Sequence, residues 1–283
     1  PDYEPYLKAL GAAEAADDVF AVSAYCPIIN LDHSDMAYEW QFYGVNTFIK
    51  GGFMAKDNAP VSGLSEEQVN LSKQLKDMFP AYLNSLKLKD MQGNLLTLDP
   101  DGNGNFKELV KSYIKASAQK ALDNGNDLSS FTFLTITDRK VKVLDFNAYV
   151  KHMGRQKAPP AFDAPDLSTP ENMLFGNSQT NLQHFTDFAS NHSKVNAALA
   201  DETIVKMMNP MYYVGHENTN TAKHWRIRHG TRDKDTGLAI PVILATLLQN
   251  KGYNVSLELP WEVPHSGDYD PDELFQWIDG ICK

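Results

Sequence analysis

The sequence contains little cysteine and too little positive charge to balance its acidic side chains. Only two cysteines occur in 283 residues, Cys26 and Cys282, and they form no C-x-x-C motif, which argues against a disulfide framework. We interpret them as two buried free thiols, which favours the cytoplasm. Lysine and arginine number 26 against 36 acidic residues, a net charge of −10, so the sequence predicts no nucleic-acid partner. Small molecules or other proteins are the expected partners.

Long hydrophobic runs are also missing. No stretch of 18 apolar residues occurs, and the N-terminus lacks the basic, then apolar, then small-residue pattern of a signal peptide, so no membrane insertion is expected. The chain begins at Pro1 rather than methionine. We interpret this as a processed product or a fragment, which leaves secretion open. The hydrophobic content of 42% is enough for a substantial core in one large domain or two ordinary ones.

Two parts of the sequence alternate between strand and helix patterns. Residues 19–27 form a nearly continuous apolar run, typical of a strand buried on both faces, and they follow an alanine-rich helical stretch over residues 6–16. Downstream the predicted order is strand, helix, strand, helix, over residues 224–228, 238–250, 254–259 and 272–281. This alternation builds a parallel sheet, so the predicted fold class is α/β.

The intervening region, residues 39–210, has a different character. It begins with a capping-box sequence at residues 65–68 that starts an amphipathic helix. Its other predicted elements are a helix over 106–122, a β-hairpin from 131–137 and 141–144, and a proline-rich loop over 156–171. We interpret residues 39–210 as an α+β insertion into one interrupted sheet.

Asp233 and His265 are the first candidates for chemistry. Asp233 follows one predicted strand and His265 follows the next, so both would lie at the same carboxyl edge of a parallel sheet, where ligands bind in open α/β proteins. A carboxylate that holds one imidazole nitrogen leaves the other nitrogen to accept a proton from a serine hydroxyl. An ordinary loop aspartate and loop histidine remain the alternative interpretation. No G-x-S-x-G motif occurs in the sequence, so a catalytic triad would be incomplete within it.

Two other groups of residues could bind a metal. The stretch from Asp99 resembles the first half of an EF-hand loop, but Val110 stands where the bidentate glutamate belongs. Its candidate calcium ligands are Asp99, Asp101, Asn103 and Asn105. Calcium there would be structural, and a turn that caps the following helix is the alternative. A second group follows the first predicted strand and consists of Asp32, His33 and Asp35; polar residues at a sheet edge are the favoured interpretation of it.

Three sequence runs carry a resemblance to a known family. They are A-V-S-A-Y-C-P-I-I-N-L-D-H-S-D-M-A-Y-E-W, R-I-R-H-G-T-R-D-K-D-T and L-P-W-E-V-P-H-S-G-D-Y-D-P-D-E-L-F-Q-W-I-D. They resemble bacterial tannases, the gallate-ester hydrolases of the tannase and feruloyl esterase group, and the likeness extends over nearly the whole chain. The resemblance implies an α/β-hydrolase core from residues 1–38 and 211–283, with residues 39–210 as an inserted lid. It also implies that the nucleophile serine precedes residue 1.

The same resemblance implies roles for individual residues. Asp233 would be the triad acid and His265 the triad base. Asp235, Lys157 and Glu171 would bind hydroxyls of a galloyl ring, because carboxylates accept hydrogen bonds from such hydroxyls and an ammonium donates to them. No cofactor is required by this chemistry.

We therefore expect a serine esterase that hydrolyses galloyl esters through an acyl-enzyme. This chain alone would be inactive, and the segment with the serine would accompany it, as a second chain for example. A non-catalytic polyphenol-binding protein and a feruloyl, that is hydroxycinnamoyl, esterase are the alternatives.

Overall fold

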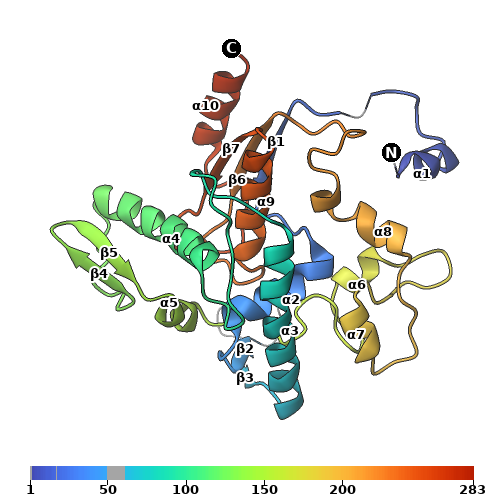
Figure 1. Cartoon of the computed structure of the whole chain (residues 1–283), viewed down its shortest axis with the longest axis horizontal. Helices are drawn as coiled ribbons and strands as arrows, with labels where there is room; N and C mark the ends of the chain where they lie inside the picture. Colours follow the sequence, from blue (N-terminus) through green and yellow to red (C-terminus); the bar gives the residue numbers. More distant parts are fainter. Residues whose placement is uncertain (1, 17, 50–60) are drawn as a thin grey trace.

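Three parallel strands form a sheet in the upper part of Figure 1, beside α9. The computed structural model describes residues 2–16, 18–49 and 61–283. The strands are, in spatial order, β1 (Ala21–Tyr25), β6 (His224–Arg228) and β7 (Asn254–Glu258). β6 pairs with both neighbours in parallel, although about 200 residues separate it from β1. The predicted alternation of strands and helices around a parallel sheet is confirmed, and the carboxyl ends of all three strands lie at one edge.

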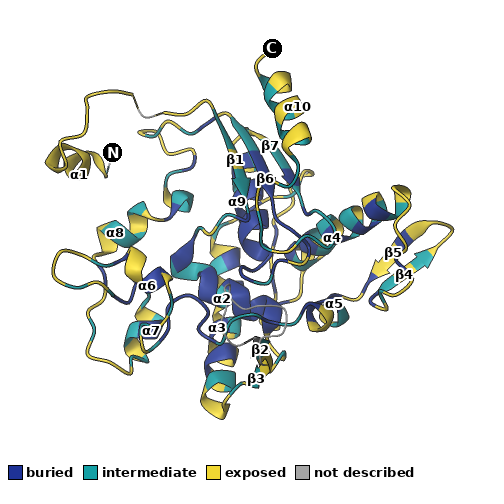
Figure 2. Ribbon diagram, turned by 180° about the vertical axis from the view of Figure 1, so that it is seen from behind, coloured by how far each residue is buried: buried dark blue, intermediate teal, exposed yellow. Residues whose placement is uncertain are grey.

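Two buried helices connect this sheet to the rest of the molecule. α9 (Ala239–Asn250) joins β6 to β7 and is apolar around most of its circumference, so nearly all of its side chains are buried. α2 (Leu31–Phe42) follows β1 and packs against α9 on one side and against α3 (Glu66–Ser85) on the other. Figure 2 shows the buried residues concentrated on α2, α9 and β6, whereas α1 (Glu4–Ala9) is exposed.

The remaining elements lie between α2 and β6 or at the C-terminus. In the first part of this region are β2 (Thr47–Ile49), β3 (Val61–Gly63), α4 (Asn105–Asp123), β4 (Leu134–Thr137), β5 (Lys140–Leu144) and α5 (Phe146–Met153). Short helices follow, namely α6 (Glu171–Leu174), α7 (Asp187–Asn191), α8 (Glu202–Met207) and the 3-10 helix η2 (Pro210–Tyr212), and α10 (Pro271–Ile281) ends the chain. The predicted lid boundary at residue 39 falls inside α2, and the division into core and lid stays a prediction.

Several local predictions are confirmed in detail. The side chain of Ser65 caps α3 by accepting a hydrogen bond from the backbone amide of Gln68. The backbone amide of Ser65 donates to the side-chain oxygen of Gln68, which completes the capping box. The hairpin of β4 and β5 turns at Asp138 and Arg139, which both have positive φ, as a two-residue turn of the type I′ class requires.

Three expectations need correction. The predicted helix over residues 6–16 ends at Ala9 because no residue of α1 is buried against the protein, and helix propensity alone does not extend so short a helix. β1 is not buried on both faces, since Ser23 is exposed and its neighbours are half-buried; among the described residues β1 pairs only with β6, so one side of it is an edge. Cys26 is a buried free thiol as expected, but Cys282 is exposed just beyond α10.

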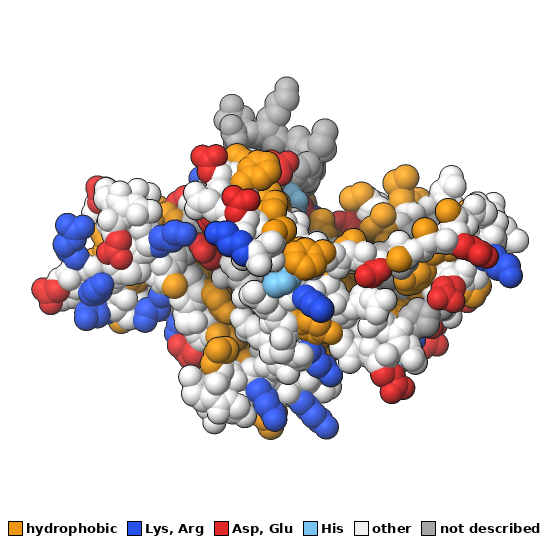
Figure 3. Space-filling view, turned by 90° about the horizontal axis from the view of Figure 1, so that it is seen from above, with side chains coloured by type: hydrophobic (Ala, Val, Ile, Leu, Met, Phe, Trp, Pro, Cys, Tyr) orange, Lys and Arg blue, Asp and Glu red, His pale blue; other side chains and the backbone are white. Residues whose placement is uncertain are grey.

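The hydrophobic core extends from α9 into the region between α2 and β6. Trp40 of α2 contacts the rings of Phe79, Phe106 and Phe146, so the core that surrounds α9 continues into the region between α2 and β6. On the face shown in Figure 3, acidic and basic side chains are mixed, with hydrophobic side chains exposed between them. Among the described residues, no helix combines the length and the hydropathy that a membrane span requires.

Candidate active site

Asp233 and His265 form a hydrogen-bonded pair at the carboxyl edge of the sheet. Asp233 lies in the loop after β6, and His265 lies in the loop after β7, with 2.9 Å between His265 Nδ1 and Asp233 Oδ2. The other carboxylate oxygen of Asp233 accepts hydrogen bonds from the backbone amides of Asp235 at 2.9 Å and Thr236 at 3.3 Å. The sequence placed these two residues together from strand order alone, and the structure brings them into direct contact.

Backbone hydrogen bonds connect the loop after β6 to the loop after β7. The backbone amide of Arg232 donates to the carbonyl of Val263 at 3.0 Å, and Thr231 donates to Pro260 at 2.9 Å. At Gly230 a Cβ atom would lie 1.9 Å from the carbonyl oxygen of Val263, so only glycine permits this approach. Gly230 is therefore a packing requirement of the contact between these two loops.

The pair holds Asp233 as a carboxylate and makes the imidazole of His265 a stronger base. Burial by itself raises the pKa of Asp233, but the neighbouring His229 and the hydrogen bond from His265 outweigh it, and the pKa lies below the ordinary value. The hydrogen bond to Asp233 raises the pKa of His265, with a further contribution from Cys26, against an opposing effect of burial. A histidine in this setting is stabilised when it receives a proton, which is what a general base does during catalysis.

Lys157, Glu171 and Asp235 form a second polar group close to the pair. Lys157 Nζ lies 3.3 Å from a carboxylate oxygen of Glu171 and 3.3 Å from one of Asp235, and all three side chains are largely buried. They come from three segments, namely the loop after α5, the start of α6 and the loop after β6. Gln156, which the sequence did not single out, donates to Asp235 Oδ1 at 3.1 Å. The structure thus brings together the three residues that the resemblance had assigned to one ring.

A cavity of about 790 Å³ joins the two groups. His265 lies on its wall, as do Lys157, Glu171 and Asp235. The rest of the wall is largely apolar and includes Ile28 and the proline-rich loop around residues 158–170. A mostly apolar cavity with a few convergent polar groups is the usual form of a small-molecule site.

The polar side of α2 holds the loop that carries Lys157. Tyr38 is fully buried, accepts hydrogen bonds from the backbone amides of Gln156 at 3.1 Å and Lys157 at 3.2 Å, and donates to the carbonyl of Lys234. Asp35 accepts from the amides of Phe162 at 2.8 Å and Asp163 at 3.1 Å. Asp35 was a possible metal ligand by sequence, but here its carboxylate fixes the backbone of the cavity wall.

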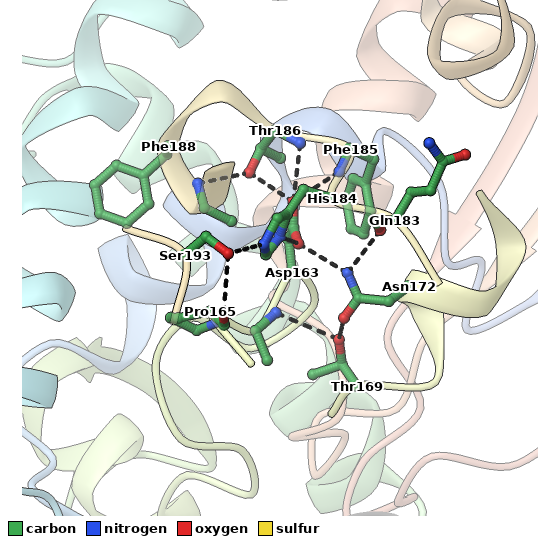
Figure 4. A network of polar contacts seen from close by, with 12 residues as sticks. Asp163, Pro165, Thr169, Asn172, Gln183, His184, Phe185, Thr186, Phe188 and Ser193 are labelled. Carbon is green, nitrogen blue, oxygen red and sulfur yellow. Dashed lines mark hydrogen bonds and ion pairs between the residues drawn. The ribbon is translucent and has the colours of Figure 1, made fainter. Parts of the chain in front are cut away.

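Asp163 is the centre of a buried hydrogen-bond network in this wall (Figure 4). His184 Nδ1 lies 2.7 Å from one of its oxygens, and His184 Nε2 lies 2.8 Å from Ser193 Oγ. The backbone amides of Phe185 and Thr186 converge on the other oxygen, both at 2.9 Å. Asn172 Nδ2 also donates to Asp163, so the network ties the residue after Glu171 to the opposite loop.

The other candidate metal groups take part in local structure. Asp99 Oδ1 accepts from the amides of Asp101 at 3.0 Å and Asn103 at 2.9 Å, and Asn105 accepts from the amide of Thr97, as in a turn that leads into α4. Calcium binding there stays a prediction. Asp32 accepts a hydrogen bond from Asn209 at 2.8 Å in the first turn of α2.

Solved structures similar to this chain cover nearly all of it. The native tannin acyl hydrolase of Lactobacillus plantarum matches at 48% identity with a TM-score of 0.95, over 99% of this chain and 60% of its own. Fusobacterium nucleatum tannase matches at 45% identity with a TM-score of 0.92, over 100% of this chain and 63% of its own. The chain is a tannase-like protein, and a partial one. It spans about three fifths of the length of these tannases.

A structure of a tannin acyl hydrolase in complex with ethyl gallate matches at 48% identity with a TM-score of 0.94, over 99% of this chain and 60% of its own. No protein-family model and no curated relative matches the chain. The suspected resemblance to bacterial tannases is confirmed by the structural matches.

Proposed function

We propose that this chain carries the acid, the base and the ring-binding residues of a serine esterase that hydrolyses galloyl esters. One observation supports this above all. His265, paired to Asp233, lines the same cavity as the cluster of Lys157, Glu171 and Asp235, so a bound ring would present its ester group near the base. Such positioning of the substrate supplies much of an enzyme's rate enhancement.

The fold fits this proposal as the C-terminal part of an α/β-hydrolase core. β1, β6 and β7 would be its last three strands, with the acid after β6 and the histidine after β7, in the chain order of that fold. Residues 39–210 would form the lid, which covers the substrate and limits access of water. The polar contacts of α2 with the loop after α5 would hold the lid in place.

The three polar residues match the chemistry of a galloyl ring, which has three adjacent hydroxyls. The ammonium of Lys157 would donate to a hydroxyl oxygen, and the carboxylates of Asp235 and Glu171 would accept from hydroxyl protons. Glu171 Oε2 is buried and has no hydrogen-bond partner among the described residues, so it is an acceptor available to a ligand. A hydroxycinnamoyl ring has fewer hydroxyls to satisfy this cluster, which favours gallate over a feruloyl ester.

The reaction would proceed in two halves. A serine hydroxyl outside these 283 residues adds to the ester carbonyl while His265 takes its proton, which gives a tetrahedral intermediate. The ester bond then breaks as His265 gives the proton to the leaving alcohol, and the galloyl group stays on the serine. Water attacks this acyl-enzyme in the same way and releases gallic acid and the free serine. Asp233 holds His265 in the required tautomer and stabilises its imidazolium.

A fluorophosphonate probe tests the nucleophile in the whole protein. We expect one serine to be labelled, on a polypeptide segment or second chain outside the present sequence, and labelling to disappear with His265→Ala. No labelling, together with tight gallate binding, would instead support a non-catalytic polyphenol-binding protein. Faster turnover of methyl ferulate than of methyl gallate would support the feruloyl esterase.

Substitution of Asp235 tests the ring-binding role. Loss of a hydrogen bond to a charged group costs roughly 1.5–3 kcal/mol, so Asp235→Asn should lower kcat/KM for methyl gallate about 10- to 100-fold. Hydrolysis of methyl benzoate, which has no ring hydroxyls, should change little. Asp166→Asn makes the same chemical change elsewhere on the cavity wall and is the matched control. Equal losses for both esters with Asp235→Asn would contradict the assignment.

A further inference from the structure

Cys26, His229 and Asp233 meet on the buried side of the candidate pair. β1 and β6 are paired so that Tyr25 lies opposite Arg228, and the next residues, Cys26 and His229, therefore leave the sheet side by side. The amide of Cys26 donates to the carbonyl of Arg228 at 2.7 Å, which fixes this placement. One thiol, imidazole or carboxylate atom from each of the three residues lies within 4.8 Å of the other two.

His229 is the unusual member of this group. It is fully buried, and neither ring nitrogen has a hydrogen-bond partner among the described residues. Asp233 Oδ2 lies 3.6 Å from its Nδ1, which is too long for a hydrogen bond. Leaving a buried polar atom unpaired is unfavourable, so a ligand that engages this imidazole would be stabilised.

We propose that Cys26, His229 and Asp233 form a binding site for a thiophilic divalent cation of the zinc or cadmium type. A thiolate, an imidazole and a carboxylate are the ligands that these ions prefer. A tetrahedral ion with bonds of about 2.0–2.3 Å holds its ligand atoms roughly 3.5 Å apart, so small side-chain rotations close the group around it. Water from the cavity would complete the coordination, because the neighbouring His265 lines that cavity and is partly exposed.

Occupation of this site would inhibit the esterase, a consequence that depends on the proposed function. Asp233 Oδ2 accepts the hydrogen bond from His265 Nδ1, and it is also the oxygen nearest His229. An ion bound to this oxygen would withdraw it from His265 and leave the base without its orienting partner. The thiol of Cys26 would lose its proton to solvent on binding, so the affinity should rise with pH.

Cadmium titration of the whole protein tests the site directly, because a cadmium–thiolate bond absorbs in the ultraviolet whether or not the protein is active. We expect one ion for each copy of this chain and loss of the absorption band in both Cys26→Ala and Cys26→Ser, with circular dichroism to confirm folding. Cys282→Ala removes the other, exposed cysteine of this chain and should leave the band unchanged. His229→Gln should weaken binding by more than about tenfold, since even outer-shell changes cost 10- to 100-fold.

Ethyl gallate hydrolysis, measured for each variant relative to its own rate without cadmium, tests the consequence. Inhibition should follow the same cadmium dependence as the band and disappear in both Cys26 variants. Absence of the band from the unsubstituted protein, or its persistence in the Cys26 variants, would overturn the site. A saturated band without inhibition would overturn its link to Asp233. Lack of any hydrolysis before cadmium is added would count against the proposed function, and the band alone would then decide the site.

Discussion

Among the described residues, the aspartate–histidine pairs Asp233–His265 and Asp163–His184 have similar nitrogen-to-oxygen distances. His265 Nδ1 lies 2.9 Å from Asp233, and His184 Nδ1 lies 2.7 Å from Asp163. Ser193 lies 2.8 Å from the second nitrogen of His184, so the second group even has the residue types of a catalytic triad. The distance between aspartate and histidine therefore does not distinguish a catalytic pair from a structural one.

The surroundings distinguish them. His184 has no exposed surface, and the hydroxyl of Ser193 lies 2.8 Å from the carbonyl of Val195, to which it can donate. Neither His184 nor Ser193 lines the large cavity, whereas His265 lines it with 22% of its side chain exposed. We infer that the Asp163 group stabilises the cavity wall, and that the Asp233 group is the one that can reach a substrate.

The largest expected effect is on turnover. Asp233→Asn retains the shape of the side chain but cannot hold His265 in the correct tautomer, and the rate should fall about 10⁴-fold. The measurement is kcat for methyl gallate in the whole protein, with unfolding followed in parallel to show that the fold is retained. A fall of less than about tenfold would remove Asp233 from the proposed mechanism.

The second expected effect is on stability and concerns the other pair. Asp163→Asn leaves one side-chain oxygen for the several donors that now bind the two carboxylate oxygens, and it places an amide NH2 group among those donors. The free energy of unfolding should therefore fall by about 3–5 kcal/mol. Urea denaturation measures this change. Asp166→Asn, an exposed aspartate on the same loop, should cost less than about 1 kcal/mol. If Asp163→Asn leaves stability unchanged and abolishes labelling by a fluorophosphonate, then the Asp163 group rather than the Asp233 group is catalytic.

A third effect concerns the protonation of His265. The carboxylate of Asp233 stabilises the imidazolium, so the pKa of His265 lies above its ordinary value of 6.5. The raised pKa adds to the free energy of unfolding. This contribution is complete below pH 6.5, the ordinary pKa of histidine, and is lost as the pH rises through the pKa of His265 in the folded protein. In Asp233→Asn the charge is gone and the pKa of His265 should fall, which NMR titration of the ring protons measures. An unchanged pKa would mean that Asp233 does not set the charge of His265.

Much of the fold near the site was predictable because its signals are local. The boundaries of β6, α9, β7 and α10 follow from strand alternation, an apolar helix and a proline at a helix start. The order of strand, loop, helix and strand was then enough to place Asp233 and His265 at the same carboxyl edge of the sheet.

The ring-binding cluster could not be derived in this way. Lys157 and Glu171 come from the proline-rich stretch of sequence, which has no periodicity, and only the resemblance to tannases pointed to them. Their positions depend on contacts between distant segments, such as the hydrogen bond between Tyr38 and the backbone of Lys157. The Asp163 network has the same origin, since its members are spread from the proline-rich loop to the end of α7. Asp35 and Tyr38, which hold this wall from α2, are themselves buried, and the sequence does not show that these polar side chains are buried.

The smallest expected effect is that of Ser193→Ala. This change removes the hydroxyl next to His184 Nε2 but keeps the Asp163–His184 contact, so stability should fall by only about 1 kcal/mol, the usual worth of one hydrogen bond. The kcat for methyl gallate should be unchanged, because Ser193 serves the cavity wall and not the reaction. The double variant with Asp163→Asn should lose less than the sum of the two single changes, since both act on one network. A large fall in kcat with stability intact would instead identify Ser193 as a nucleophile and reverse the roles of the two pairs.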